Sequence, residues 1–330
     1  MPMNFLLKTT LVLWLSLMPV TVVPFLSSGR SAEAQPLKEV RIASSTTVSF
    51  TNLSTFYARD KGFFEKEGLD TKIIVVQTNA ALAALVSGNV DYTTLSTSAI
   101  EAALRGMPVR LVAVTSQQPV WGLVVRKGIT KVADLKGRKI AVSSYGGASY
   151  AAVVYVLKQH GINPKEVTIL ATGETLARIA ALRNEAVDAA IIAAPGDMKA
   201  LTLGDFRLLL DVGSMYKLPM GGISTSQAKI RENPSEIRRL VRAVVGATRF
   251  IVDARNKSEV LNYIAAGFKL DRHSSEELYK RVVPSLSTTG MVEGDKIKLV
   301  IDSAVERGLT DKAVEPDAVV DFSFVKELGR

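Results

Sequence analysis

The 330-residue sequence contains no cysteine and only two histidines, His160 and His273. The lack of cysteine excludes disulfide bonds, thiolate zinc sites and cysteine nucleophiles, and two imidazoles are too few for a histidine-based metal cage. The sequence also lacks the glycine-rich phosphate loops, the G-x-S-x-G elbow and the H-E-x-x-H zinc signature. Both histidines are expected to be solvated. We therefore expect no metal site, no cofactor and no catalytic residue.

Acidic residues are in deficit, because 41 Lys and Arg face 32 Asp and Glu and give a formal net charge of +9. Such an excess can indicate nucleic-acid binding, but here the basic residues are dispersed. The densest segment, residues 126–139, lacks the interleaved aromatic side chains of single-strand binders. We interpret that segment as a solvated face and expect no nucleic-acid partner.

The first 34 residues have the order of a secretory signal peptide. Lys8 precedes an uncharged apolar run at residues 11–26, and Ala32-Glu33-Ala34 matches a small-residue cleavage site. A membrane anchor is disfavoured, because the run is shorter than the roughly 20 residues of a span and two prolines interrupt it. We expect cleavage after Ala34 and a periplasmic protein; loss of Lys8, Arg30 and Glu33 would lower the net charge from +9 to +8.

The remaining chain alternates β-branched runs with helical stretches, which predicts an α/β fold with mostly parallel sheets. Asn233-Pro234 predicts the start of a long helix toward Ala254, and Ser274 with Glu277 predicts a capping box for the next helix. Gly161 is expected to end a helix over residues 150–160. The expected strands are residues 40–43, 72–76, 111–114, 122–125, 139–142, 167–170, 189–193 and 206–210.

An internal repeat relates two stretches of the chain. Ala83-Ala84-Leu85 followed by Val90-Asp91 recurs 97 residues later as Ala180-Ala181-Leu182 followed by Val187-Asp188. Upstream, Ile42–Ser45 is echoed by Ile140–Ser144. Because these elements keep the same order, we interpret them as a duplicated lobe rather than as chance similarity between Ala/Leu-rich helices.

Hydroxyl-rich loops follow several of the expected strands, at the edge where open α/β sheets bind ligands. Hydroxyl groups and backbone N–H groups at helix starts form a neutral surface for an anion. Helix capping would explain any single loop, but recurrence at five strand ends, including Thr115–Gln118 and Thr172–Thr175, predicts a shared ligand site. Arg178 could reach an anion there, although we favour a solvated helix position for it. The candidate ligand-binding residues are Ser44, Ser45, Thr46, Thr47, Ser96, Thr97, Ser98, Ser144, Gly147, Ala148 and Ser149, with the neighbouring aromatics Trp121 and Tyr145.

Several short motifs together resemble a known family. They are Phe56-Tyr57-Ala58, Lys61–Leu69, Ala84–Asp91, Arg105–Val109, Asp134–Val142 and Val187–Ala190. In this order they resemble the periplasmic substrate-binding proteins of ABC importers, in the branch with nitrate-, sulfonate-, taurine- and thiamine-precursor-binding members. The resemblance covers nearly the whole chain after residue 34. One departure is Glu185, which stands where the family usually has a glycine and bears on the local turn.

The resemblance implies a type II periplasmic-binding-protein fold with two lobes and two hinge crossings. Lobe 1 would span residues 35–125 and return as residues 223–330, and lobe 2 would span residues 126–222, with hinges near Val125 and Gly222. It adds Ala194 and Pro195 to the expected ligand contacts.

The resemblance also implies a monomeric extracytoplasmic receptor. It would capture a small anionic or polar organic solute by lobe closure and deliver it to an ABC permease in the inner membrane, without acting as an enzyme. Two alternatives stay open: an enzyme on the same scaffold acting on a pyrimidine-type thiamine precursor, and a ligand-sensing partner of a membrane receptor. The ligand itself stays open among sulfonate, nitrate, carboxylate and neutral heterocycle.

Overall fold

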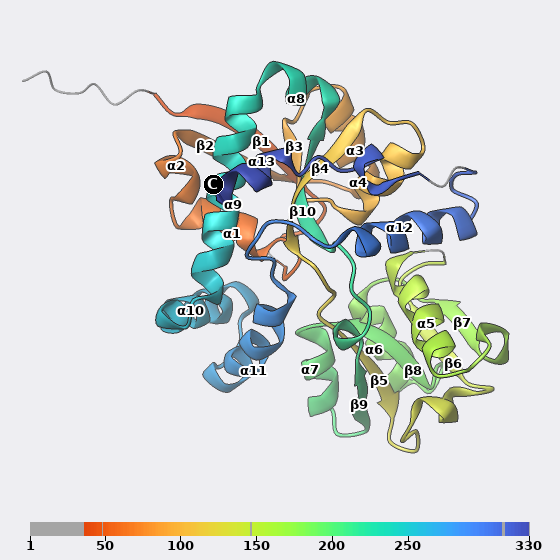
Figure 1. Cartoon of the computed structure of the whole chain (residues 1–330). Coiled ribbons are helices and arrows are strands. Elements are labelled where there is room, and N and C mark those ends of the chain that lie inside the picture. The colour runs from red at the N-terminus through yellow and green to blue at the C-terminus, as the bar shows by residue number, and fades with distance from the viewer. Residues whose placement is uncertain (1–35, 48, 146, 312–313, 330) are drawn as a thin grey trace, which may run out of the picture. The chain divides into compact units, whose positions relative to one another are not determined.

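The computed structural model describes residues 36–47, 49–145, 147–311 and 314–329, which form two five-stranded sheets flanked by helices (Figure 1). The predicted signal peptide and its cleavage site lie outside the described residues. Within the described ranges, no helix combines the length and apolar character that a membrane crossing requires. The first sheet contains β1 (Lys38–Ser44), β2 (Leu69–Val75), β3 (Tyr92–Thr93), β4 (Val109–Ser116) and β10 (Gly221–Ser226). The second contains β5 (Trp121–Arg126), β6 (Lys139–Val142), β7 (Thr168–Ala171), β8 (Ala189–Ala193) and β9 (Phe206–Asp211).

The two sheets have the same construction. The strand order is β2-β1-β3-β10-β4 in the first and β7-β6-β8-β5-β9 in the second. In each sheet the first three strands pair in parallel, and the fourth pairs antiparallel with both of its neighbours. This agrees with the interpretation of a duplicated lobe and confirms the α/β class.

The repeated Val-Asp turns form the same hydrogen bonds in both sheets. The carboxylate of Asp91 accepts the backbone N–H of Arg41 at 2.8 Å, and that of Asp188 accepts the backbone N–H of Lys139 at 2.9 Å. The backbone N–H of each aspartate in turn donates to the carbonyl of the same partner residue. Each turn therefore fastens the start of one strand to its parallel neighbour, so the motif stabilises the sheet and is not a ligand contact.

Thirteen α-helices lie within the described ranges, and the longest, α9, begins at Pro234 as predicted. Its apolar residues recur every three or four positions, and this face, which includes Ile237, Val241 and Val244, is buried against α1 and the first sheet. The helices are α1 (Leu53–Asp60), α2 (Phe63–Lys66), α3 (Thr78–Val86), α4 (Thr97–Leu104), α5 (Ala148–Gln159), α6 (Thr175–Arg183), α7 (Gly196–Thr202), α8 (Gln227–Glu232), α9 (Pro234–Val252), α10 (Lys257–Phe268), α11 (Arg272–Val282), α12 (Gly294–Glu306) and α13 (Ser323–Lys326).

One helix start differs from its prediction. The capping box expected at Ser274 is wrong, because α11 already begins at Arg272, and the carboxylate of Asp271 accepts the backbone N–H of Ser274 at 2.8 Å. Asp271 is itself a strong N-cap residue and precedes the predicted one. Gly161, by contrast, follows α5 with a φ of 70°, the left-handed conformation expected of a glycine at that end of a helix.

Two segments carry the chain between the sheets, and they can be followed in Figure 1 from β4 to β5 and from β9 to β10. They are residues 117–120 and 212–220. Strands β4 and β9 end at the carboxyl edges of their sheets, and the antiparallel strands β5 and β10 begin there. A four-residue segment reaches only about 17 Å. Both crossings therefore join the carboxyl edge of one sheet to the nearby carboxyl edge of the other.

The crossings lie before the positions expected for the hinges. Val125 is inside β5 and Gly222 is inside β10, so the segment 121–125 belongs to the second sheet rather than to the first. Gly222 serves close packing, since a Cβ there would lie 2.3 Å from the carbonyl oxygen of Ala113. The two crossings also touch, because a Cβ on Gly213 would lie 2.1 Å from the carbonyl oxygen of Pro119. The extent of each lobe stays a prediction.

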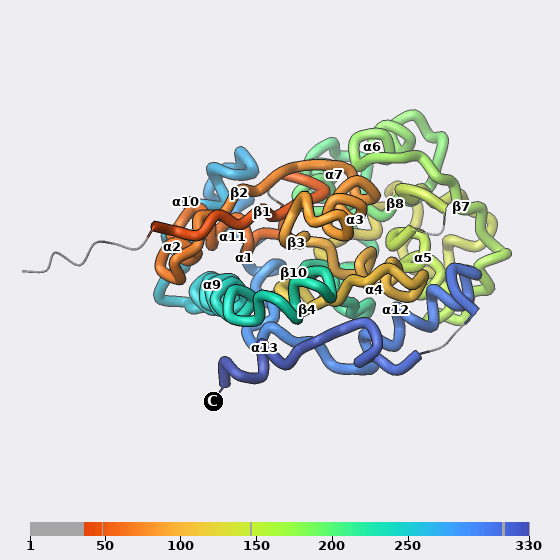
Figure 2. Tube along the Cα trace, turned by 90° about the horizontal axis from the view of Figure 1, so that it is seen from above, coloured from red at the N-terminus to blue at the C-terminus, as the bar shows by residue number. Residues whose placement is uncertain are grey.

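After β10 the chain remains with the first sheet. Helix α9 covers one of its faces, and the C-terminal segment returns to it, where Val320 pairs with Leu111 and α13 lies beside β4 and α9 (Figure 2).

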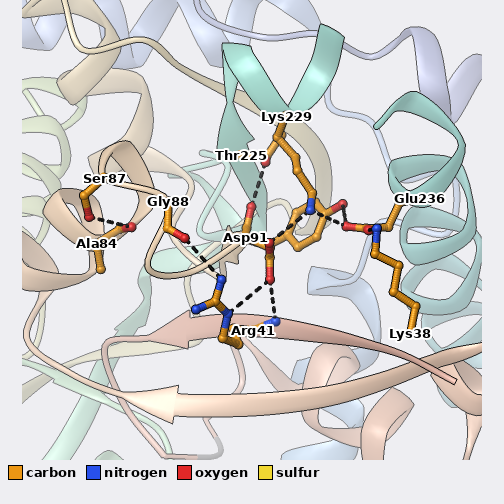
Figure 3. A network of polar contacts seen from close by, with 10 residues as sticks. Lys38, Arg41, Ala84, Ser87, Gly88, Asp91, Thr225, Lys229 and Glu236 are labelled. Atoms are coloured by element: carbon orange, nitrogen blue, oxygen red, sulfur yellow. Dashed lines mark hydrogen bonds and ion pairs between the residues drawn. The ribbon is translucent and has the colours of Figure 1, made fainter. Parts of the chain in front are cut away.

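A buried ionic network ties this returning chain to the amino ends of β1 and β3 (Figure 3). The Nζ of Lys229 in α8 lies 3.0 Å from the carboxylate of Asp91 and 2.7 Å from that of Glu236. Glu236 is 2% exposed and also pairs with Lys38 at 2.6 Å, while the hydroxyl of Tyr92 donates to it at 2.9 Å. Burial raises the pKa of Glu236, but these hydrogen bonds outweigh it and hold the pKa below its ordinary value. The network lies at the amino ends of the strands, so its charges are internal supports of the first lobe.

Candidate functional site

The loop after β1 is organised around the side chain of Asn52. Ser44 is fully buried; its hydroxyl donates to the carbonyl of Thr46 at 2.8 Å and accepts from the Nδ2 of Asn52 and the hydroxyl of Thr94, each at 3.0 Å. Asn52 also donates to the carbonyl of Thr47 at 3.1 Å. Ser44 is thus a support of the loop, whereas Ser45 is half-buried and Thr46 and Thr47 are exposed. Asn52 was not among the predicted residues, although an asparagine directly before an apolar helix start is a signal for such a role.

The hydroxyl groups at the start of α4 are engaged by a chain crossing. Ser96 and Thr97 both donate to the carbonyl oxygen of Pro219, at 2.6 and 2.7 Å, and Pro219 belongs to the crossing 212–220. A hydroxyl has a single hydrogen to donate. In this conformation neither group can donate to an oxyanion, so both predicted contacts anchor the crossing. Ser98 is half-buried.

The loop after β6 presents its polar groups differently. The hydroxyls of Ser143 and Ser149 lie 2.7 Å apart and bond to each other. Ser144 and Tyr145 are exposed, and the ring of Tyr145 meets that of Tyr150 edge to face at 6.4 Å. Gly146 lies outside the described residues. Because Ser143 and Ser149 bond to each other and Ser144 is exposed, Ser144 is the serine of this loop that is best placed to bind a ligand.

The helices that follow these loops begin without side-chain caps. This holds for α1, α4, α5 and α6, whose N-cap side chains accept no hydrogen bond from the N–H groups of the first helical turn. Simple capping, the alternative explanation for the hydroxyl-rich loops, is therefore wrong for the four loops that precede these helices. First-turn N–H groups that no cap occupies, together with the helix dipole, can bind an oxyanion.

Arg178 of α6 is buried, so the solvated position we favoured for it is wrong. The residue is 6% exposed. One terminal nitrogen, Nη1, donates to the carbonyl of Gly173 at 2.7 Å, and Nη2 donates to the hydroxyl of Thr175 at 3.2 Å, while Nε has no partner. Burial lowers the pKa of Arg178, and the nearby Glu174 opposes this. A guanidinium so buried at the carboxyl edge of a sheet is a candidate anion-binding group.

A small cavity of about 20 Å³ is lined by three predicted residues, Thr97 of α4 and Gly147 and Ala148 at the start of α5. Helix α4 follows a strand of the first sheet, and α5 follows a strand of the second. A larger cavity of about 670 Å³ is lined by Arg126, Arg138 and other residues near the amino ends of β6, β8 and β9. It lies at the opposite edge of the second sheet from the predicted loops. Cavity volume therefore does not single out the predicted site.

The other predicted residues lie apart from this small cavity. Trp121 is half-buried against the apolar cluster that contains Leu123, Ala194 packs against the cluster that contains Val112, and Pro195 directly precedes α7. His160 and His273 are exposed, as expected. The basic segment 126–139 is a solvated face, with its cations exposed or half-buried and several of them paired with carboxylates. Among the residues described, no three His, Asp or Glu side chains are placed to hold a metal ion.

Comparison with known proteins places this geometry in a family. The riboflavin-binding protein RibY of Chloroflexus aurantiacus is 27% identical over 233 residues, 68% of this chain and 66% of RibY. The 4-amino-5-hydroxymethyl-2-methylpyrimidine phosphate synthase THI11 of Saccharomyces cerevisiae is 30% identical over 148 residues, 42% of each chain. The fold is that of a putative periplasmic sulfonate-binding protein, SsuA of Methylobacillus flagellatus KT, with a TM-score of 0.74 and 20% identity over 89% of this chain and 96% of that one. Residues 50–257 match the family described as NMT1/THI5 like. The chain has the two-lobed periplasmic-binding-protein fold and belongs to the NMT1/THI5-like family.

Proposed function

We propose that this protein is an extracytoplasmic receptor that captures a small anionic or polar organic solute between the carboxyl edges of its two sheets. The observation that carries this proposal is the course of the two crossings. Both join carboxyl edge to carboxyl edge, so the uncapped helix starts of the two lobes converge on one region. Open α/β sheets bind ligands at this edge.

The mechanism we propose is closure of the lobes on the solute without covalent chemistry. Backbone N–H groups at the starts of α5 and α6 and the hydroxyl of Ser144 would bind polar oxygens of the ligand. Contacts made from both lobes would favour the closed state, which is a shift of population between two conformations. The crossings 117–120 and 212–220 would absorb the rotation.

Export and delivery to a membrane ABC permease complete the proposal. They are supported by the fold shared with SsuA, described as the periplasmic sulfonate-binding protein of a putative ABC transporter, and by the similarity to RibY. The predicted cleavage after Ala34, the monomeric state and the permease partner are parts of this proposal. The ligand classes are sulfonate, nitrate, carboxylate and neutral heterocycle.

A thermal-unfolding screen of the purified protein with ethanesulfonate, nitrate, acetate, riboflavin and a 4-aminopyrimidine tests the proposal. A true ligand at 100 times its Kd should stabilise the folded state by about 2.7 kcal/mol. Small-angle scattering with that ligand should then show a smaller radius of gyration. Stabilisation without compaction would contradict lobe closure, and a panel that stabilises nothing would contradict the receptor.

A second candidate is an enzyme on the same scaffold. The similarity to THI11, a pyrimidine phosphate synthase, favours it over part of the chain. The absence of cysteine and the exposed positions of His160 and His273 leave this site without a thiol nucleophile and without a histidine base. Product formation from a pyrimidine precursor by the wild-type protein, lost on Ser144→Ala, would favour the enzyme; intact precursor after prolonged incubation would favour the receptor.

A further inference from the structure

Arg178 differs in its partners from two other poorly exposed cations, Arg281 and Lys229. The side chain of Arg281 is 19% exposed and pairs with Asp197 at 2.7 Å. The side chain of Lys229 is 15% exposed and pairs with both Asp91 and Glu236. Arg178 is a buried residue, whereas Lys229 and Arg281 are half-buried, yet its hydrogen-bond partners are neutral oxygens.

A buried guanidinium without a counter-anion is costly, because the loss of hydration is not offset by an opposite charge. The guanidinium has five N–H donors in a planar fork. Two of its nitrogens donate to the carbonyl of Gly173 and the hydroxyl of Thr175, and Nε remains without a partner. Arg178 therefore lacks an acceptor at Nε, and the carboxylate that acts on it, that of Glu174, is exposed and forms no ion pair with it.

The surroundings of Arg178 supply further donors. Thr175 accepts the bond from Nη2, which leaves the hydrogen of its own hydroxyl available to a ligand. Thr175 is also the first residue of α6, a nine-residue helix that begins without a side-chain cap. A Cβ on Gly196 would lie 2.5 Å from the methyl of Thr175, so the starts of α6 and α7 adjoin. Thr175, which accepts a hydrogen bond from the guanidinium, thus lies at the carboxyl edge of the second sheet and beside Gly196, the residue that follows Ala194-Pro195.

We propose that Arg178 is the charged anchor for the oxyanion group of the ligand, assisted by the hydroxyl of Thr175 and the first N–H groups of α6. This rests on the proposed receptor function and specifies its ligand class. The solute carries a sulfonate or carboxylate rather than being a neutral heterocycle. The fork of arginine matches the two oxygens of such a group, which a lysine ammonium does not.

Binding of matched ligand pairs tests the proposal. Ethanesulfonate is compared with ethyl methyl sulfone, and acetate with acetamide, by calorimetry on the wild type, Arg178→Gln, Arg178→Lys and Arg183→Gln. Arg183 is an exposed arginine on the same helix and serves as the control. We expect Arg178→Gln to weaken binding of the preferred anion about 10- to 100-fold, the usual range for hydrogen bonds to a charged group. Arg178→Lys should lose part of the affinity, and Arg183→Gln less than about 2-fold.

A merely structural role would give a different pattern. If Arg178 only holds the loop at Gly173, Arg178→Gln should lower the melting temperature of the ligand-free protein and weaken anion and neutral analogue equally. If Arg178 anchors an anion, removal of the unpaired charge should leave the ligand-free melting temperature unchanged or raised, and affinity for the neutral analogue should change less than about 3-fold. Equal weakening of both ligands, or unchanged anion affinity, overturns the proposal.

The role of Arg178 and the receptor function are overturned by different results. A wild-type protein that binds a neutral heterocycle and neither anion overturns the role of Arg178 and leaves the receptor standing. A wild-type protein that binds no solute of the panel overturns the receptor itself.

Discussion

Replacing Arg281 by alanine should destabilise the folded protein by about 3 kcal/mol near neutral pH, the usual cost of breaking a buried ion pair. Helix α11 packs with the first lobe, and the Nη2 of its Arg281 lies 2.7 Å from the carboxylate of Asp197 in α7 of the second lobe. Asp197 is 1% exposed. The other carboxylate near Arg281, that of Asp211 at 3.3 Å, is 38% exposed and should contribute little. In Arg281→Ala the buried carboxylate of Asp197 loses its cation and keeps the hydrogen bond that it accepts from the backbone N–H of Met198 at 2.8 Å.

The loss of stability in Arg281→Ala should depend on pH. Burial raises the pKa of Asp197, and the bond from Arg281 opposes that rise. Without Arg281 the pKa should rise further. A carboxyl group whose pKa is higher in the folded than in the unfolded state destabilises the fold as pH increases from the unfolded pKa, about 4, through the folded one. The deficit of Arg281→Ala should therefore be largest above neutral pH and smaller near pH 5.

Urea unfolding at pH 5 and pH 7.5 measures this effect in four proteins: the wild type, Arg281→Ala, Asp197→Asn and the double variant. If the ion pair is the cause, Arg281→Ala should cost less than about 1 kcal/mol in the Asp197→Asn background. Arg272→Ala is the control, because Arg272 forms an exposed pair with Glu276 on the same helix and should change stability little. A loss at pH 7.5 below about 1 kcal/mol, or an equal loss in both backgrounds, would refute the reasoning.

Three further changes test other parts of the structure by denaturant unfolding of the ligand-free protein. Lys229→Met should cost about 3 kcal/mol, because it leaves two carboxylates in a buried network; a neutral result would mean that the network is not held by this charge. Glu185 has a φ of 57° where its counterpart in the repeat, Gly88, has 76°. Glu185→Gly should therefore gain about 1 kcal/mol and Gly88→Ala lose a similar amount, and shifts of the same sign would contradict this. Thr97→Val removes a bond to the carbonyl of Pro219 and should cost about 1 kcal/mol; weaker ligand binding at unchanged stability would return Thr97 to the ligand site.

Local sequence patterns predicted the fold well where a strand is a run of apolar residues. All eight predicted strands are present, with ends shifted by up to three residues. Strands β3 and β10 were missed, because β3 has two residues and β10 reads GGISTS, which has no apolar run. The hinges were predicted too far along the chain, because the apolar residues 122–125 would form a strand of the same appearance in either sheet. Sheet membership depends on pairing with β8 and β9, which no local pattern records.

The site was predicted less completely, because residue type indicates a hydrogen-bonding group but not its partner. Ser44, Ser96 and Thr97 are where the sequence suggested, yet each hydroxyl donates to a backbone carbonyl of the protein. For Arg178 a local signal did exist. It lies four residues before Leu182, so both side chains share one face of α6, and Leu182 is buried.

These internal hydrogen bonds engage the candidate anion-binding groups of the first lobe but leave some of those on the second lobe available. On the first lobe, Ser96 and Thr97 hold Pro219 of the crossing 212–220, so a rotation that displaced Pro219 would either carry the start of α4 with it or break two hydrogen bonds, at about 2 kcal/mol. On the second lobe, the hydroxyl of Ser144 is exposed, and the guanidinium of Arg178 has one nitrogen without a partner. If the protein closes on an anion as proposed, the second lobe holds the charge complement, and the first lobe controls the crossing about which closure occurs. Ligand affinity and the equilibrium between open and closed states should then respond to different residues, Arg178 for the first and Ser96 with Thr97 for the second.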